Sequence, residues 1–351
     1  MKKITMQSIA DLAGVSRATV DKVIHNRPGV SDEVREKIRG IILETNYQPV
    51  QIRKFAHKET QKRMAVIMPK LQDSFFYDMK QGMDEAAARL RADGLKMDYY
   101  FCTDFEPQQI LSILDYLKDT QINGIALRGL LNKTIIDRVN EFIDRGIPVY
   151  TFDADIPSSK RICYIGEDPF RTGQLAASLA VKSLEPGSKI AILTGSNYVT
   201  SCANRIKGFT SYLSKHAPTI NIAAIEETLS QHVLTYQKTA RILRMHPDID
   251  GIWNCACHSE DMAQAVIDAG MKDEVKLFAF LFNSPSYITE LVQDGTIDYA
   301  ILLNPRKMGK LIISSMYEYW MSGIAPPGEM ISVPIYIGCD VNIDLLSDTT
   351  V

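Results

Sequence analysis

The stretch AGVSRATVDKVIHNRPGVSDEVREKI, residues 13–38, decides how the first part of this 351-residue chain folds. With its flanks it predicts three helices: one that ends in a sharp turn at Gly14, a short one capped by Ser16, and one capped by Ser31. Apolar residues recur at helical spacing, so the three helices can close on one small core. These residues are Ile9, Leu12, Val15, Val20, Val23, Ile24, Val34, Ile38, Ile41 and Ile42. The stretch therefore predicts a small all-α helix-turn-helix head.

The second of these helices presents hydrogen-bond donors on its outer face. Arg17, Thr19 and Lys22 offer a guanidinium, a hydroxyl and an ammonium group at the end that would enter a DNA major groove. Residues 1–63 hold 13 Lys and Arg against 7 Asp and Glu, whereas the rest of the chain holds 26 against 35. Ordinary surface helices are also rich in lysine and arginine, but a basic head on an acidic body suits phosphate neutralisation. Double-stranded DNA is therefore the expected partner.

The composition disfavours several other classes of protein. No run of about 18 apolar residues is present, so no membrane span is expected. The first fifteen residues lack the continuous apolar core of a signal peptide, which favours a cytoplasmic protein. The six cysteines are scattered apart from Cys255 and Cys257, which His258 follows. A metal is conceivable there, but a second Cys/His pair is missing, so we expect free thiols, no metal and no cofactor.

From Met64 onward, apolar strands alternate with amphipathic helices. The expected strands lie near residues 64–69, 96–102, 124–129, 147–153, 189–195, 220–226, 251–255, 276–281 and 297–303. Such alternation predicts parallel sheets flanked by helices, and there are too many strands for one comfortable sheet. We therefore expect an α/β body of two lobes with a ligand cleft between them, where the carboxyl ends of the strands meet. The predicted divisions are a head at residues 1–48, a hinge or linker at 49–63 and the body at 64–351.

Particular residues carry a family resemblance. In the head they are Ile9-Ala10, Ala13-Gly14-Val15-Ser16, Ala18-Thr19-Val20, Val30-Ser31, Arg35, Ile38 and Asn46-Tyr47-Gln48-Pro49. In the body the motifs are weaker: Asp73-Ser74-Phe75-Phe76, Val149-Tyr150-Thr151-Phe152-Asp153, Arg205 with Gly208-Phe209, Asp250-Gly251-Ile252, Asp294-Gly295-Thr296-Ile297-Asp298 and Asn304-Pro305. The head resembles that of the lac-repressor-like bacterial transcription regulators, and the body resembles the periplasmic sugar-binding-protein fold.

The resemblance implies a homodimer or tetramer whose paired heads read a pseudo-palindromic operator. A small effector, commonly a sugar or sugar derivative, would bind between the lobes and change their angle, the hinge and hence the DNA affinity. Matching positions would place Arg17, Ala18 and Lys22 at base edges. Other matching positions would lean toward phosphates, namely Thr5, Ser16, Thr19, Asn26 and Ser31, although Thr19 can instead face inward or cap its helix. No leucine heptad follows Asn342, so a dimer is favoured over a tetramer.

Two departures from the family pattern affect the DNA interface. Asp21 stands where the family often has serine; it can accept from a cytosine amino group, pair with Lys22 or Arg17, or point away. In the hinge, Arg53 and Ala56 replace the usual alanine and leucine. Ala56 is too small to act as the apolar wedge that leucine supplies in the minor groove, whereas Arg53 suits a narrow minor groove. The linker can also have no ordered role.

The resemblance also indicates effector-binding positions, each of which can alternatively be structural. Phe75 and Phe76 follow the first strand of the body, where family members stack aromatic rings on sugars. Polar candidates at strand ends and helix starts are Arg128, Asp153, Arg205, His258 and Ser259. Two arginines in one pocket favour an anion such as a sugar acid. Leu281 and Leu303 replace an aspartate and a glutamine that the family usually has, which predicts a less polar pocket wall.

Two other functions compete with a DNA-binding regulator. An enzyme is disfavoured because neither G-x-G-x-x-G nor G-x-x-x-x-G-K follows a strand and no paired acid–base motif is present, so no catalytic residue is assigned. A solute-binding receptor without catalytic activity remains as the alternative, although it would have no use for a DNA-reading head. The expected function is a transcription regulator, with repression as the family's usual mode.

Overall fold

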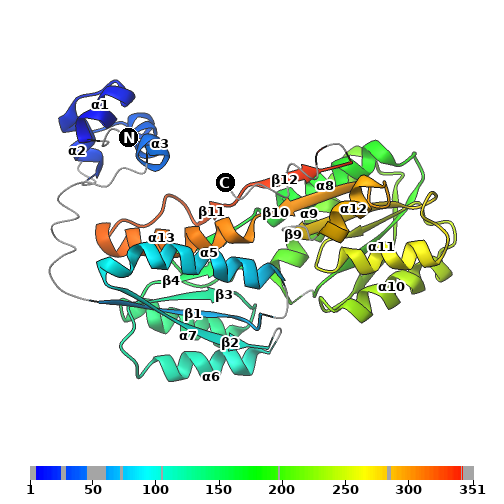
Figure 1. Cartoon of the computed structure of the whole chain (residues 1–351), viewed down its shortest axis with the longest axis horizontal. Helices are drawn as coiled ribbons and strands as arrows, with labels where there is room; N and C mark the ends of the chain where they lie inside the picture. The colour runs from blue at the N-terminus through cyan, green and yellow to red at the C-terminus, as the bar shows by residue number, and fades with distance from the viewer. Residues whose placement is uncertain are drawn as a thin grey trace.

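The computed structural model describes residues 5–24, 29–45, 61–71, 74–103, 106–196, 198–282, 286–340 and 342. The three predicted helices of the head are confirmed and are drawn in blue in Figure 1. They are α1 (Met6–Ala13), α2 (Arg17–Ile24) and α3 (Asp32–Thr45). Gly14 adopts the left-handed conformation that ends α1, with φ +69°, and the Ser16 hydroxyl accepts the Thr19 amide at 3.1 Å at the start of α2.

The core of the head follows the predicted spacing with one exception. The buried residues are Ile9, Ala10, Ala13, Val20, Val23 and Ile38, with Val15, Val30, Val34, Ile41 and Ile42 packed against them. Leu12 was expected in this core and is instead 59% exposed, because the inner face of α1 is formed by Ile9, Ala10 and Ala13. The side chain of Ile24 lies outside the described part of the chain.

The body consists of two lobes, each built on a six-stranded sheet (Figure 1). In the N-terminal lobe the strand order is β11-β5-β4-β3-β1-β2. Its strands are β1 (Lys62–Pro69), β2 (Leu95–Cys102), β3 (Gly124–Arg128), β4 (Val149–Phe152), β5 (Cys163–Gly166) and β11 (Met330–Ser332). Its helical elements are α5 (Ser74–Leu90), η1 (Arg91–Asp93), α6 (Pro107–Leu117), α7 (Lys133–Asp144) and α13 (Pro305–Ser322). Helices α5 and α13 cover one face of the sheet, and α6 and α7 cover the other.

The C-terminal lobe repeats this plan with the strand order β12-β10-β9-β8-β6-β7. Its strands are β6 (Lys189–Thr194), β7 (Asn221–Glu227), β8 (Gly251–Asn254), β9 (Lys276–Phe282), β10 (Tyr299–Leu303) and β12 (Ile335–Gly338). Its helices are α8 (Pro169–Ser183), α9 (Thr200–His216), α10 (His232–Met245), α11 (Ser259–Asp268) and α12 (Ser286–Gln293). Among the described helices, none combines the length and the hydropathy that crossing a lipid bilayer requires.

All nine predicted strands are present, but the sheets contain three more that the sequence did not reveal. Strands β5, β11 and β12 have only four, three and four residues, too few for a recognisable pattern. The predicted parallel sheets flanked by helices are confirmed, and one of the added strands, β12, runs antiparallel to β10. The chain enters β12 directly from the other lobe. The first residue of β12 therefore lies at the end of the sheet where the parallel strands have their carboxyl ends.

Short segments join the lobes. The chain passes between them at residues 167–168, at 304 and at 333–334, which are the residues between the flanking elements. Short connections of this kind are typical of hinges between lobes. The positions of the three segments also place the carboxyl ends of both parallel sheets opposite each other.

Each lobe contains one pair of helices in unusually close contact. A Cβ atom added to Gly82 of α5 would lie 1.9 Å from the Arg306 carbonyl oxygen of α13, and one on Gly309 would lie 2.1 Å from that of Met79. Helices α8 and α9 meet in the same way, since a Cβ on Gly173 would lie 1.9 Å from the Arg205 carbonyl oxygen. Glycine therefore allows backbone-to-backbone packing that fixes the start of α9, which carries Arg205.

Candidate effector site and DNA-binding head

A cavity of about 480 Å³ lies between the lobes, at the carboxyl ends of their strands. The N-terminal lobe contributes Pro69, Lys70, Phe75, Phe76, Cys102, Thr103, Arg128 and Asp153. The C-terminal lobe contributes Val199, Ser201, Cys202, Arg205, Leu229, Ser230, Gln231, His232, Ala256, Cys257 and His258. Its volume is in the range of small-molecule sites, and both lobes contribute to its lining.

The structure brings six of the seven candidate effector residues to this cavity. They are Phe75, Phe76, Arg128, Asp153, Arg205 and His258. Ser259 is not among the lining residues. It is fully buried at the start of α11, where its hydroxyl accepts from the Asn254 side-chain amide at 3.1 Å and donates to the Phe280 carbonyl at 3.3 Å. Ser259 therefore has a structural role, because its hydroxyl links the ends of β8 and β9 rather than facing the cavity.

The two leucines that were expected to make one wall less polar do not line the cavity either. Leu281 and Leu303 are each 2% exposed and belong to the hydrophobic cores on either face of the C-terminal sheet. Leu281 lies one residue before the end of β9, and its side chain packs among Val266, Ile288 and their neighbours. The expectation of a less polar wall at these positions is therefore wrong.

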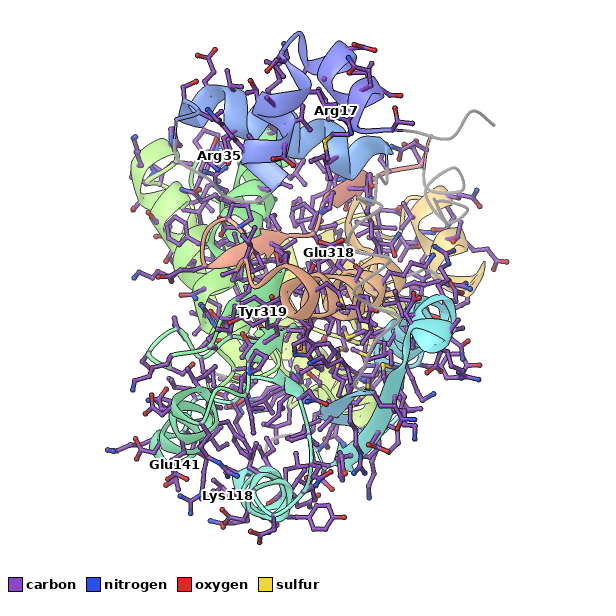
Figure 2. All side chains as sticks on the ribbon, turned by 90° about the vertical axis from the view of Figure 1, so that its left-hand side faces the viewer. Arg17, Arg35, Lys118, Glu141, Glu318 and Tyr319 are labelled. Carbon is purple, nitrogen blue, oxygen red and sulfur yellow. The ribbon has the colours of Figure 1, made fainter. Side chains whose placement is uncertain are left out.

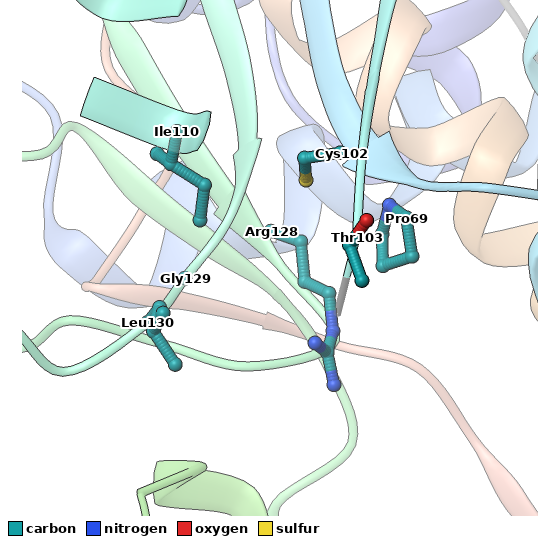
Figure 3. A pocket seen from close by; sticks show the side chains of 7 residues that line it. All are labelled: Pro69, Cys102, Thr103, Ile110, Arg128, Gly129 and Leu130. Atoms are coloured by element: carbon teal, nitrogen blue, oxygen red, sulfur yellow. The ribbon is translucent and has the colours of Figure 1, made fainter. Parts of the chain in front are cut away.

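Arg128 and Asp153 form an ion pair on the N-terminal side of the cavity. The Arg128 Nε atom donates to Asp153 Oδ2 at 2.7 Å, and the side chains are only 12% and 11% exposed. The guanidinium also lies over the Phe76 ring, 5.4 Å from its centroid, and Phe76 meets Phe75 edge-to-face. Figure 3 shows Arg128 extending past the end of its strand, away from Cys102 and Ile110. The wall thus combines aromatic rings with a charged pair.

Arg205 is held on the opposite wall by Glu167, a residue that sequence reasoning missed. Arg205 Nε donates to Glu167 Oε1 at 2.6 Å and its NH1 donates to the Cys255 carbonyl at 2.9 Å. The guanidinium stacks on the Phe280 ring at 4.0 Å, and the pair is 5% and 2% exposed. Burial disfavours the Arg205 charge, but the Coulombic attractions of Glu167, Asp153 and neighbouring groups together outweigh it and raise the arginine pKa. The cation is therefore fixed and fully charged.

Glu167 occupies the first segment that passes between the lobes, directly after β5. It also accepts a hydrogen bond from the Thr172 hydroxyl. A glutamate just after a buried strand is the signal that could have identified it, but β5 itself was not recognised in the sequence. Because Glu167 lies in a crossing segment and Arg205 in α9, their ion pair ties the connection between the lobes to the cavity wall.

Backbone strain is concentrated at this cavity. Among the described residues, four that are not glycine have a positive φ, between +50° and +66°. They are Asp153, Leu229, Ser230 and His258. All four line the cavity. Residues other than glycine seldom adopt this conformation, and it persists where the surrounding structure enforces it, commonly at ligand sites. At Asp153, the Tyr164 hydroxyl donates to the backbone carbonyl at 3.1 Å and helps to hold the turn.

In the head, the proposed base-reading side chains are accessible. Arg17, Ala18 and Lys22 of α2 are exposed, and Figure 2 shows Arg17 within the helical head. Thr19 is half-buried, and its hydroxyl lies 2.9 Å from that of Ser16. Three hydroxyl residues fall on exposed positions at helix starts: Thr5, which caps α1 and accepts from the Ser8 amide, Ser16, which precedes α2, and Ser31, which precedes α3. Asn26, Arg53 and Ala56 lie outside the described residues.

Comparison with known families agrees with this architecture. Residues 5–50 match the model for bacterial regulatory proteins of the lacI family, and residues 64–323 match that for the periplasmic binding protein domain. Solved sugar-binding proteins share the fold of the body. A solute-binding protein from Burkholderia graminis in complex with D-arabinose is 23% identical over 82% of this chain and 98% of its own, with a TM-score of 0.74. The glucose-galactose binding protein GanP from Geobacillus stearothermophilus is 23% identical over 84% of this chain and all of its own, with a TM-score of 0.73.

Curated relatives are regulators. The transcriptional regulator DegA of Bacillus subtilis is 27% identical over 64% of this chain, and the match spans 65% of DegA, just under two thirds. The ribose operon repressor of Halalkalibacterium halodurans is 27% identical over 71% of this chain and 70% of its own length. The sucrose operon repressor of Pediococcus pentosaceus is 26% identical over 76% of each chain. The chain therefore belongs to the periplasmic binding protein domain family and carries, ahead of that domain, the helix-turn-helix head of the lacI family of bacterial regulatory proteins.

Proposed function

We propose that this chain is a sequence-specific DNA-binding transcription regulator, acting as a repressor, whose operator affinity is set by a neutral polyhydroxy effector of the sugar class. The observation that carries the proposal is a cavity reached from both lobes whose two arginines are each already paired with a carboxylate. The basic head with an exposed Arg17 and Lys22 supplies the DNA-binding half.

The walls of the cavity suit a sugar. Phe75 and Phe76 offer aromatic surface to the C–H face of a sugar ring, while Asp153 accepts hydrogen bonds from hydroxyl groups. Arg205 has five N–H donors, and three are directed at Glu167 and the Cys255 carbonyl. The remaining two can donate to ligand oxygens. The cavity therefore offers fixed donors and fixed acceptors around an apolar platform.

The balance of charge favours a neutral effector over the sugar acid that two arginines in one pocket first indicate. Asp153 neutralises Arg128, and Glu167 neutralises Arg205. An added carboxylate would have to compete with these partners while losing its own hydration, which costs free energy. A neutral hydroxyl instead adds to the existing hydrogen bonds. Lys70 is the additional cation of the cavity, and its side chain is exposed.

The route from cavity to operator uses the two lobes. An effector that contacts both lobes stabilises one lobe arrangement and thereby changes the affinity of the head for DNA. By linkage, bound DNA changes the affinity of the cavity for the effector by the same factor. We propose that two copies of the chain pair, in the cytoplasm, and present two heads to an operator. The proposed divisions are residues 1–48 for the head, 49–63 for the hinge and 64–351 for the effector and dimerisation body. No catalytic activity is expected, and a head of this kind would have no use in a solute receptor.

Fluorescence anisotropy on a labelled operator, selected from random DNA with the full-length protein, tests the proposal. A panel of neutral pentoses, hexoses and disaccharides would be titrated beside the corresponding sugar acids at fixed salt. Arg17→Ala should weaken operator binding about 5- to 150-fold, the loss expected for one base-reading contact of about 1–3 kcal/mol. Arg171→Ala, a substitution at an 82%-exposed arginine of the body, is the matched control and should change nothing.

The effector site is tested with Asp153→Asn, because asparagine tolerates the left-handed backbone and keeps the shape of the side chain. Losing a hydrogen bond to a charged acceptor, worth about 1.5–3 kcal/mol, should raise the effector Kd about 10- to 150-fold. Asp137→Asn makes the same chemical change at a 51%-exposed aspartate and should leave the Kd unaltered. Sequence-independent DNA binding would contradict the regulator. A response to sugar acids but to no neutral sugar would contradict the neutral effector.

A further inference from the structure

Four side chains that can bind a metal converge on the C-terminal side of the cavity. His232 is the first residue of α10, His258 precedes α11, and Glu260 and Asp261 lie in the first turn of α11. One ligand atom from each of the four lies within 4.8 Å of the others. His232 Nδ1 is 2.7 Å from Asp261 Oδ2 and 3.7 Å from Glu260 Oε1, while His258 Nδ1 is 3.5 Å from Glu260 Oε1. The two imidazole rings lie 3.6 Å apart between centroids.

The hydrogen-bond partners of His258 define which of its nitrogens faces the cluster. Its Nε2 atom is 3.0 Å from the Ser230 carbonyl oxygen, which only accepts, so we assign the proton to Nε2. In the neutral ring, Nδ1 then carries a lone pair that is directed toward the Glu260 carboxylate. Two acceptors that face each other at 3.5 Å repel each other, and an attractive contact needs an electrophile between them. A proton or a metal ion supplies it.

A metal ion fits this arrangement better than protons. Protonating both imidazoles would place two positive charges in rings whose centroids lie only 3.6 Å apart. One divalent ion instead balances the two carboxylates with both imidazoles neutral. Zinc binds histidine nitrogen at about 2.0–2.1 Å and carboxylate oxygen at about 2.0–2.2 Å, so ligand atoms of a tetrahedral site lie roughly 3.3 Å apart. The distances of 2.7, 3.5 and 3.7 Å lie on either side of this value.

The surroundings of the cluster match those of metal ligands elsewhere. A histidine that binds a metal commonly donates its other ring N–H to a backbone carbonyl, as His258 does to Ser230. The left-handed backbone of His258, with φ +66°, fixes the direction of its Cα–Cβ bond and so the position of the imidazole ring. We propose that His232, His258, Glu260 and Asp261 form a binding site for a divalent transition-metal ion of the Zn²⁺ class. Nitrogen ligands in this number favour such an ion over Mg²⁺ or Ca²⁺.

The site would join the start of α10 to the start of α11 at the wall of the effector cavity. It lies in a part of the sequence where the prediction concerned Cys255 and Cys257, and it uses neither cysteine. The sequence did not indicate it because His232 lies 26 positions before His258. The inference does not rest on the proposed function: metal binding can fail while operator and effector binding persist, and the reverse also holds.

Metal titration of the full-length, tag-free protein after chelator treatment tests the site. Zn²⁺ would be titrated by calorimetry, and Co²⁺ by the visible absorption that a tetrahedral ligand field produces. We expect one ion per chain. His258→Asn, in which asparagine suits the left-handed backbone, should weaken Zn²⁺ binding by more than the roughly 10- to 100-fold that the loss of an outer-shell partner costs. His246→Asn, at the far end of α10, is the matched control and should bind like the parent protein.

A second variant guards against a folding defect. The His232 side chain is 65% exposed, so His232→Asn should fold normally and still lose Zn²⁺ affinity. Zn²⁺ should also raise the thermal unfolding temperature of the parent and the His246→Asn protein, and not that of the two cluster variants, because an ion that binds the folded state stabilises it by mass action. Absence of saturable Zn²⁺ binding to the parent, or equal binding by all variants, would overturn the proposal.

Discussion

Replacing Glu167 with glutamine should destabilise the protein more than any other loss of a single carboxylate charge described above. The change removes the partner of Arg205 while keeping the shape of the side chain. Both residues are almost completely buried, at 2% and 5% exposure. Removing one partner of a buried ion pair typically costs about 3–5 kcal/mol, because the other charge is left without compensation in a medium of low dielectric constant.

The remaining contacts of Arg205 set the expected value within that range. The guanidinium would keep its hydrogen bond to the Cys255 carbonyl and its place on the Phe280 ring, where a desolvated cation–π contact is worth about 2 kcal/mol. We therefore expect a loss near the lower end, about 3 kcal/mol. For a domain of this size that corresponds to a fall in Tm of roughly 6–12 °C.

Urea unfolding monitored by tryptophan fluorescence in a Trp320→Phe background measures this loss in the relevant lobe, since the remaining Trp253 stacks on Phe209 of the helix that carries Arg205. Glu141→Gln is the matched control. Glu141 pairs with Lys118 at 2.6 Å on the surface, where Figure 2 shows both, and such a pair contributes about 0–1 kcal/mol.

The double variant Glu167→Gln with Arg205→Met separates charge from packing. Because it removes both members of the pair, no uncompensated charge stays buried, and it should be more stable than Glu167→Gln alone. If the single variant lost less than about 1 kcal/mol, or if the two substitutions were additive, the assignment of Glu167 as the partner that keeps Arg205 charged in the cavity wall would be refuted.

Two further substitutions test other features of the fold. Gly173→Ala would place a methyl group 1.9 Å from a carbonyl oxygen of the facing helix, so urea unfolding should show a loss of about 1–3 kcal/mol or more in the free energy of unfolding. Gly40→Ala meets no atom within 4 Å and should be neutral or stabilising. Equal effects of the two substitutions would contradict the close helix contact. Hydrogen bonds from Arg306 and Lys310 lower the pKa of Glu85 from its usual 4.5 to about 2, which stabilises the fold above pH 4.5 and is lost as the pH falls toward 2. Glu85→Gln should therefore lower the urea midpoint at pH 7 and match the parent near pH 2; a difference that persists at pH 2 would contradict this.

The sequence was sufficient to predict the architecture, because the spacing of apolar residues within a single segment indicates whether that segment is a helix or a strand. Nine strands and the three helices of the head were predicted at their observed places. The omissions are short elements at sheet edges, and they have a common physical origin. A strand of three or four residues such as β5 or β11 is defined by its neighbours in the sheet rather than by a pattern of its own.

The cavity was predicted less completely because it depends on pairings across the chain. Arg205 could be identified as a candidate from its position at a helix, but its partner lies 38 residues earlier in a segment that looked like a connection. Ser259 was predicted to line the cavity because it lies near a strand end, but its hydroxyl is directed toward the sheet. Local sequence indicates which residues lie near a strand end, whereas the direction of a side chain is set by the packing around it.

The position of Glu167 suggests how the cavity is coupled to the lobe arrangement. It lies in a crossing segment of two residues, so rotation of the lobes must change its backbone, while its carboxylate is bound to a cation of the cavity wall. A ligand that takes hydrogen bonds from Arg205 stabilises the orientation of the guanidinium that Glu167 holds, and through it one conformation of the crossing segment. To move an equilibrium from 1:99 to 99:1, the effector must favour one arrangement about 10⁴-fold, or about 5.5 kcal/mol. Two or three hydrogen bonds to charged groups, at about 1.5–3 kcal/mol each, provide that difference if they form in one arrangement alone.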